Sequence, residues 1–100
     1  MKFIKFIQDI NEAPGMYLVN KVEDVDLIIL GYLSAQIDDL EYESIKAVLN
    51  TFNDFVNKYY ETNEDYQWAR LIRFNCSTDL ITREMFAKLF SEFIQTKNFI

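Results

Sequence analysis

The sequence is 100 residues long, the size of one ordinary domain, and half of its residues are apolar. Two glycines and one proline are too few for a disordered or low-complexity chain. The absence of histidine removes the usual general base and the commonest metal ligand, so we expect neither enzyme activity nor a cofactor. Sixteen acids against ten bases give a net charge of −6, which argues against direct nucleic-acid binding and favours a basic partner. We predict a single domain over residues 1–100.

The single cysteine and the hydropathy pattern bear on location. Cys76 cannot form an internal disulfide, which favours a reducing compartment. Lys5, Gln8 and Asp9 interrupt the N-terminal segment before a secretion signal could form. The longest uncharged stretch, residues 27–37, is well short of the ~20 apolar residues of a membrane span. We therefore expect a cytoplasmic protein that does not contact a membrane.

The apolar residues recur mostly at helical spacing, which predicts an all-α fold, a compact bundle of about five helices. The first helix is expected over residues 2–12 and is ended by Ala13-Pro14-Gly15. The second is expected to begin at a capping box formed by Asn20 and Glu23 and to run to Leu40.

The middle of the chain carries the clearest helical period. Within the second helix, Gly31 and Ala35 form a small face that another helix could approach closely. The third helix, residues 45–60, repeats apolar residues at i, i+3, i+4 and i+7 over four turns. Its opposite face is expected to be solvated because three asparagines lie off the apolar stripe: Asn50, Asn53 and Asn57.

The fourth element, residues 66–74, is ambiguous. Trp68, Leu71 and Ile72 fit a helix, whereas the alternation from Trp68 to Phe74 also fits a strand, and the pattern alone does not decide. A fifth helix is expected after N-cap candidates at Ser77, Thr78 and Asp79, with an apolar stripe from Met85 to Ile94. The tail Asn98-Phe99-Ile100 is expected to fray.

Acidic residues are concentrated in the middle of the chain. Residues 23–65 carry eleven acids and two lysines, a net charge of −9, whereas the flanking segments are weakly positive. Two groups combine acids with tyrosines. The first acidic cluster lies between the second and third helices: Asp38, Asp39, Glu41, Tyr42 and Glu43. The second acidic cluster follows the third helix: Tyr59, Tyr60, Glu61, Glu64 and Asp65, with Tyr66. Antiparallel helices would place the two at opposite ends of the bundle.

Both clusters are candidate partner-binding sites. Acids in loops and near helix N-termini often serve only solubility and the helix dipole. Asp38 and Asp39, however, are expected at the C-terminal end of the second helix, where the dipole disfavours negative charge. Residues that break a local rule without structural gain are more often functional. Arg70 and Arg73 are expected to pair with surface acids rather than with phosphate.

Several short segments resemble one family, in this order along the chain: Ala13-Pro14-Gly15-Met16-Tyr17-Leu18, Leu27-Ile28-Ile29-Leu30-Gly31-Tyr32, Phe52-Asn53-Asp54-Phe55-Val56, Trp68-Ala69-Arg70-Leu71-Ile72, and Phe86 to Phe93. Their order resembles that of bacterial immunity proteins that neutralise contact-dependent growth-inhibition toxins. The resemblance spans nearly the whole chain, although Val19 stands where the pattern has glycine. It identifies a scaffold, and no toxin-binding residue carries over from it.

The resemblance implies an immunity protein that binds a cognate toxin domain, of which many are basic nucleases, and a ribonuclease is the first expectation. An acidic inhibitor could occupy the surface that nucleic acid would use. The alternative is a non-catalytic helical adaptor or homo-oligomerising module, in which the charge serves solubility and an apolar patch around Tyr17, Tyr59 or Tyr60 binds. A small enzyme using paired carboxylates is the weakest hypothesis, because it requires a pocket that shifts their pKa.

Overall fold

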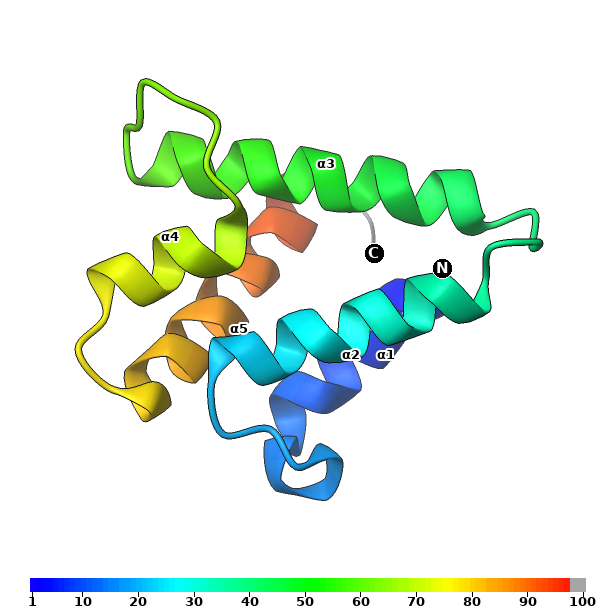
Figure 1. Cartoon of the computed structure of the whole chain (residues 1–100), viewed down its shortest axis with the longest axis horizontal. Helices are drawn as coiled ribbons and strands as arrows, with labels where there is room; N and C mark the ends of the chain where they lie inside the picture. Colours follow the sequence, from blue (N-terminus) through cyan, green and yellow to red (C-terminus); the bar gives the residue numbers. More distant parts are fainter. Residues whose placement is uncertain (98–100) are drawn as a thin grey trace.

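The computed structural model describes residues 1–97 and contains five α-helices and one 3-10 turn in this range, with no strand. The all-α prediction is confirmed (Figure 1). The expected fraying of residues 98–100 lies outside the described residues. In chain order the elements are α1 (Lys2–Glu12), η1 (Pro14–Tyr17), α2 (Val22–Ala35), α3 (Tyr42–Tyr59), α4 (Trp68–Asn75) and α5 (Asp79–Lys97).

The core contains an aromatic cluster centred on Phe52 of α3. Its ring centroid lies 5.3–5.8 Å from four other rings, one at the start of α4 and three on α5: Trp68, Phe86, Phe90 and Phe93. All four contacts are edge-on, the geometry that the charge distribution of aromatic rings favours. The helical periods predicted for α3 and α5 thus place both apolar stripes against each other.

Residues 68–75 form a helix, so the strand alternative for this segment is wrong. The buried positions are Trp68, Ala69, Leu71 and Ile72, a helical spacing, whereas a strand would also have buried Phe74, which is 89% exposed. Gln67 starts the helix, because its side-chain oxygen accepts a hydrogen bond from the Arg70 backbone N–H at 2.9 Å.

The N-terminus of α2 differs from the predicted capping box. Asp24, not Glu23, performs this role: its Oδ2 accepts hydrogen bonds from the backbone N–H groups of Asn20 (2.9 Å) and Lys21 (3.2 Å). The Val22 backbone N–H, which has no partner inside the helix, donates to the buried Thr82 hydroxyl of α5 at 3.1 Å. The start of α2 is thereby tied to α5.

The C-terminus of α2 also differs, since the helix ends at Ala35 rather than at Leu40. Residues 36–41 form a turn in which the Asp39 carboxylate accepts a hydrogen bond from the Glu41 backbone N–H at 2.8 Å. Such a side-chain bond offers the backbone an alternative to the helix. No helix in residues 1–97 approaches Gly31, because a Cβ built there would meet nothing within 4 Å.

The turn after α1 contains a strained residue. Leu18 has a left-handed backbone (φ 58°, ψ 35°) and an exposed side chain, while Val19 beside it is buried. The positive φ therefore falls one residue before the position at which the family pattern has glycine. In residues 1–97 no helix is both long and apolar enough to cross a membrane.

Candidate partner-binding face

The two acidic clusters lie at opposite ends of α3 (Figure 1). One precedes and opens this 18-residue helix, and the other closes it and continues toward α4. At 1.5 Å per residue, the ends are about 27 Å apart. A standard interface centred on one cluster would therefore leave the other at its edge or outside it.

The first acidic cluster is accounted for by the fold. Asp38 and Asp39 lie three and four residues beyond Ala35, the last residue of α2, rather than at the end of the helix as expected. They instead precede the N-terminus of α3, as does Glu41, and Glu43 lies in its first turn, where negative charge is favoured. No local rule is broken here.

The other residues near the N-terminus of α3 include a tyrosine, a lysine and two apolar side chains. Tyr42 is the first residue of α3, and the Lys46 ammonium lies 5.4 Å from its ring centroid. Ile37 immediately before the acids and Leu40 between Asp39 and Glu41 are exposed apolar side chains, Leu40 at 99%. The Lys46–Tyr42 contact and the two apolar side chains all lie near the surface.

In the second acidic cluster, Glu61 breaks two local preferences. It follows the last turn of α3 with φ 55°, a left-handed conformation usually taken by glycine. Its N–H donates to the Lys58 carbonyl and the Thr62 N–H to the Asn57 carbonyl, both at 3.1 Å, which together close the helix in a Schellman motif. A carboxylate at this helix end also opposes the dipole. The rule-breaking acid is therefore at residue 61 rather than at residues 38 and 39.

Asn57 fixes the loop that carries the rest of this cluster. Its side-chain nitrogen donates to the carbonyls of Asn53 (2.9 Å) and Tyr66 (2.8 Å). Its side-chain oxygen accepts from the Thr62 hydroxyl (2.7 Å) and the Tyr66 N–H (3.0 Å). Asn57 is buried, so the expectation that this face of α3 is solvated is wrong here.

Asn53, one turn earlier, holds the far end of the same loop. Its amide nitrogen donates to the Asp65 carboxylate (2.9 Å) and the Tyr66 carbonyl (3.0 Å), and its oxygen accepts from the Trp68 N–H (2.8 Å). Neither anchor was predicted from the sequence. The available signal was the presence of asparagine, a poor helix former, at two interior helix positions four residues apart. Only Asn50 is exposed, as expected.

Three side chains at four-residue spacing form a ridge beside this loop: Tyr66, Arg70 and Phe74. Tyr66 and Phe74 are 46% and 89% exposed. The Arg70 guanidinium makes no ion pair or hydrogen bond within residues 1–97, so its expected pairing is wrong. Tyrosine, arginine and other large aromatic side chains are enriched among the residues that contribute most to protein–protein binding.

Arg73, by contrast, pairs with acids as expected. Its guanidinium binds Glu23 of α2 at 2.7 and 2.8 Å and Asp79 of α5 at 2.7 Å. The hydrogen bond from Arg73 lowers the pKa of Glu23 below its usual value. This network joins α2, α4 and α5.

Hollows lie on both sides of the ridge, and Tyr66, Arg70 and Phe74 line both. Between α2 and α4 is a groove of about 770 Å³, the α2–α4 groove, which also includes Asp26, Leu30 and Asp65. On the other side is a pocket of about 460 Å³ with Tyr60, Thr62 and Leu71 in its wall.

Tyr60 differs from Tyr59, although the two rings contact each other edge-on. The Tyr60 hydroxyl is buried without a hydrogen-bond partner in the described part of the chain, and burial raises its pKa to about 12. Tyr59 is exposed, with the Lys88 ammonium 5.7 Å from its ring centroid.

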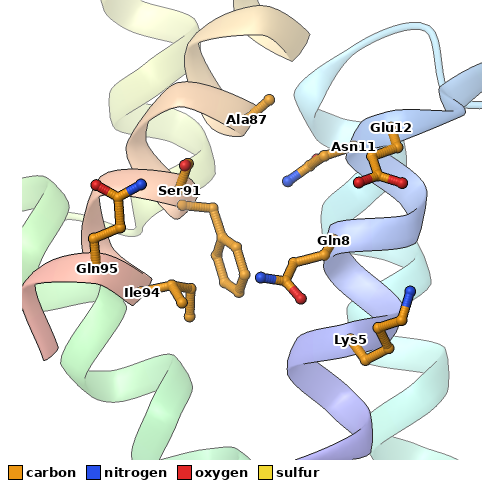
Figure 2. A pocket seen from close by; sticks show the side chains of 9 residues that line it. Lys5, Gln8, Asn11, Glu12, Ala87, Ser91, Ile94 and Gln95 are labelled. Atoms are coloured by element: carbon orange, nitrogen blue, oxygen red, sulfur yellow. The ribbon is translucent and has the colours of Figure 1, made fainter. Parts of the chain in front are cut away.

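A third hollow, of about 360 Å³, lies between α1 and α5 and shares no residue with either acidic cluster. Figure 2 shows Gln8 and Asn11 of α1 extending toward the α5 side, where Ser91 and Gln95 lie. Its lining is mixed: Lys5 and Glu12 are charged, Ala87, Phe90 and Ile94 are apolar, and the other residues are uncharged and polar.

No protein-family model matches this sequence, and comparisons with curated proteins and with solved structures find no match. Over residues 1–97 the structure itself defines the class: a small all-α protein with five α-helices. Its second acidic cluster lies on an anchored loop beside an exposed aromatic ridge.

Proposed function

We propose that this chain is an immunity protein that binds and neutralises a cognate toxin domain in the cytoplasm, without chemistry of its own. The partner we favour is a basic nuclease, first a ribonuclease, at the C-terminus of a contact-dependent growth-inhibition toxin. The observation that carries the proposal is the anchored loop between α3 and α4, residues 60–67. Asp65 and Tyr66 are held by Asn53 and Asn57 of α3, and the Glu64 carbonyl accepts a hydrogen bond from the Thr62 hydroxyl, so little conformational entropy is lost on binding.

The second acidic cluster supports this function better than the first. Glu61 has a left-handed backbone conformation that glycine would adopt more easily, and its carboxylate lies at the helix end where the dipole disfavours negative charge. No structural role explains why a glutamate occupies this position. The first cluster is placed where the α3 dipole already favours acids. We therefore centre the toxin-facing surface on Tyr59, Tyr60, Glu61, Glu64 and Asp65, and extend it to Tyr66, Arg70 and Phe74.

The proposed mechanism is stoichiometric masking. Carboxylates of Glu61, Glu64 and Asp65 would face lysines and arginines with which a nuclease holds phosphate. Tyr66 and Phe74 would supply apolar area at the centre of the contact, where most binding energy is concentrated. An interface of about 1,600 Å² in total is the usual size for a stable complex.

The adaptor or homo-oligomer alternative has one observation in its favour. Leu27 and Leu30 of α2 are 67% and 52% exposed, and Gly31 beside them is open to solvent. An apolar contact through this face would respond little to salt, whereas electrostatically steered association slows steeply as ionic strength rises.

The direct test is co-expression with the protein encoded immediately upstream, with growth and co-purification as readouts. We expect rescue of growth and a one-to-one complex. A neighbour that is not toxic, together with self-association of this chain, would instead favour the homo-oligomer.

Charge-neutralised variants then locate the surface. Replacing Glu61, Glu64 and Asp65 by their amides is expected to slow association and flatten its salt dependence. The control replaces Asp38, Asp39, Glu41 and Glu43 in the same way, which removes four charges rather than three. Equal loss from both sets would contradict the assignment to the second cluster, and no loss from either would contradict masking by charge.

A further inference from the structure

We propose that the α2–α4 groove receives one basic side chain of the toxin, an arginine or a lysine, with the carboxylate of Asp26 as its counter-charge. This inference rests on the proposed function. It adds a specificity residue on α2 that lies outside both acidic clusters.

Asp26 is a carboxylate without a cation. It is half-buried in the α2–α4 groove, and its Oδ1 accepts one hydrogen bond from the neutral Gln67 side chain at 3.3 Å. No lysine or arginine forms an ion pair with it within residues 1–97. Burial raises its pKa, as expected for a charge that lost water without gaining a counter-ion.

The neighbouring charges do not compensate Asp26. On its own helix Glu23 is also negative, and Arg73 across the groove is engaged by Glu23 and Asp79. Asp65 adds a further negative charge, and its Oδ1 already accepts from Asn53. Arg70 lines the groove but forms no ion pair in the described chain.

The groove also suits the stem of a long basic side chain. Leu30, Tyr66 and Phe74 line it and are exposed, so they can contact methylene groups while the charged end reaches Asp26. The exposed ring of Tyr66 can in addition attract a cation over its face. Gln67 is fixed by its bond to the Arg70 N–H, which keeps the donor to Asp26 in place.

The test uses a defined probe, the blocked peptide acetyl-Gly-Arg-Gly-amide, with citrulline in place of arginine as the neutral control. Backbone amide NMR shifts of the full chain are followed during titration. We expect saturable shifts at Asp26, Tyr66 and Gln67 with the arginine peptide and none with the citrulline peptide. Asp26→Asn should weaken binding about tenfold, whereas Asp38→Asn should leave it unchanged.

An unchanged Kd for Asp26→Asn, or equal binding of the citrulline peptide, would overturn the inference. Asp26→Asn has the same shape and keeps a side-chain oxygen for Gln67, and its amide spectrum reports directly whether it is folded. In the toxin complex, Asp26→Asn is expected to raise Kd about tenfold as well. A toxin that binds wild type and Asp26→Asn equally would refute the groove alone, whereas a wild-type chain that binds no toxin would refute the proposed function.

Discussion

The side chain of Asn57 pairs with the backbone of Tyr66 on both its donor and its acceptor side. The Tyr66 N–H donates to Asn57 Oδ1 at 3.0 Å, and Asn57 Nδ2 donates to the Tyr66 carbonyl at 2.8 Å. A side-chain amide thus does for this loop residue what a neighbouring strand does in a sheet. The loop has a defined shape although it contains no helix or strand of its own.

Asn57→Ala is expected to lower the free energy of unfolding by about 3 kcal/mol, because buried hydrogen-bonding groups lose their partners. The matched control is Asn50→Ala on the exposed face of the same helix, which should change it by less than ~0.5 kcal/mol. Urea unfolding followed by circular dichroism measures both. Equal effects of the two substitutions would contradict the anchoring role.

Glu61→Gly is expected to stabilise the protein by about 1 kcal/mol, because glycine adopts positive φ without steric cost. Glu61→Gln removes only the charge and should give a smaller gain, about 0.3 kcal/mol, through the helix dipole. Thermal unfolding of the two variants separates the contribution of the backbone conformation from that of the charge. If the proposed surface is correct, both variants bind the toxin more weakly while being more stable, and a variant that is more stable with unchanged affinity would remove Glu61 from that surface.

Tyr60→Phe is expected to leave the protein equally stable or up to ~1 kcal/mol more stable, because it removes a buried hydroxyl that has no partner in the described chain. The pKa of Tyr60 is raised from 10.0 to about 12. Between these two pH values the folded state therefore keeps a proton that the unfolded state loses. Wild-type stability should therefore fall as pH rises from 10 toward 12, and Tyr60→Phe should fall less. Tyr59→Phe, at the exposed neighbour, is the control, and a loss of stability in Tyr60→Phe at neutral pH would show that the hydroxyl has a partner.

Glu23 and Asp26, one turn apart on α2, should respond to acid in opposite directions. The pKa of Glu23 is lowered by its bond to Arg73, so its contribution is present above its usual pKa of 4.5 and is lost as pH falls. The pKa of Asp26 is raised by burial, so stability falls as pH rises from its usual value of 3.8 through the folded-state pKa. We expect Glu23→Gln to destabilise the protein at neutral pH but not in strong acid, and Asp26→Asn to stabilise it at neutral pH. Unfolding curves over this range test both signs, and a neutral-pH loss in Asp26→Asn would be inconsistent with an uncompensated charge.

The helices were predictable where one face is continuously apolar. Phe52 and Phe86 lie on stripes that repeat at helical spacing, and both are in the core. The end of α2 was not predictable in this way, because Asp39 competes for the backbone through a local side-chain bond that leaves no periodic signal.

The candidate site was predictable only in part. The charge count located the acids, but the role of Asn57 depends on Thr62 and Tyr66, whose position relative to α3 follows from the path of the chain. The hollows beside Arg70 likewise require α2, α3 and α4 to be packed together. Hydrogen bonds and grooves of this kind arise from tertiary structure, which residue spacing does not encode.

The only tryptophan of the chain, Trp68, lies where the anchored loop meets the core. It is 5% exposed, its ring contacts Phe52 and Phe86, and its backbone N–H is held by Asn53. Tyr66, Arg70 and Phe74 lie on the exposed side of the same segment. Intrinsic fluorescence therefore distinguishes two kinds of complex without a label: a partner that docks rigidly on the ridge leaves the emission of Trp68 unchanged, and one that lifts α4 from the core shifts it to longer wavelength.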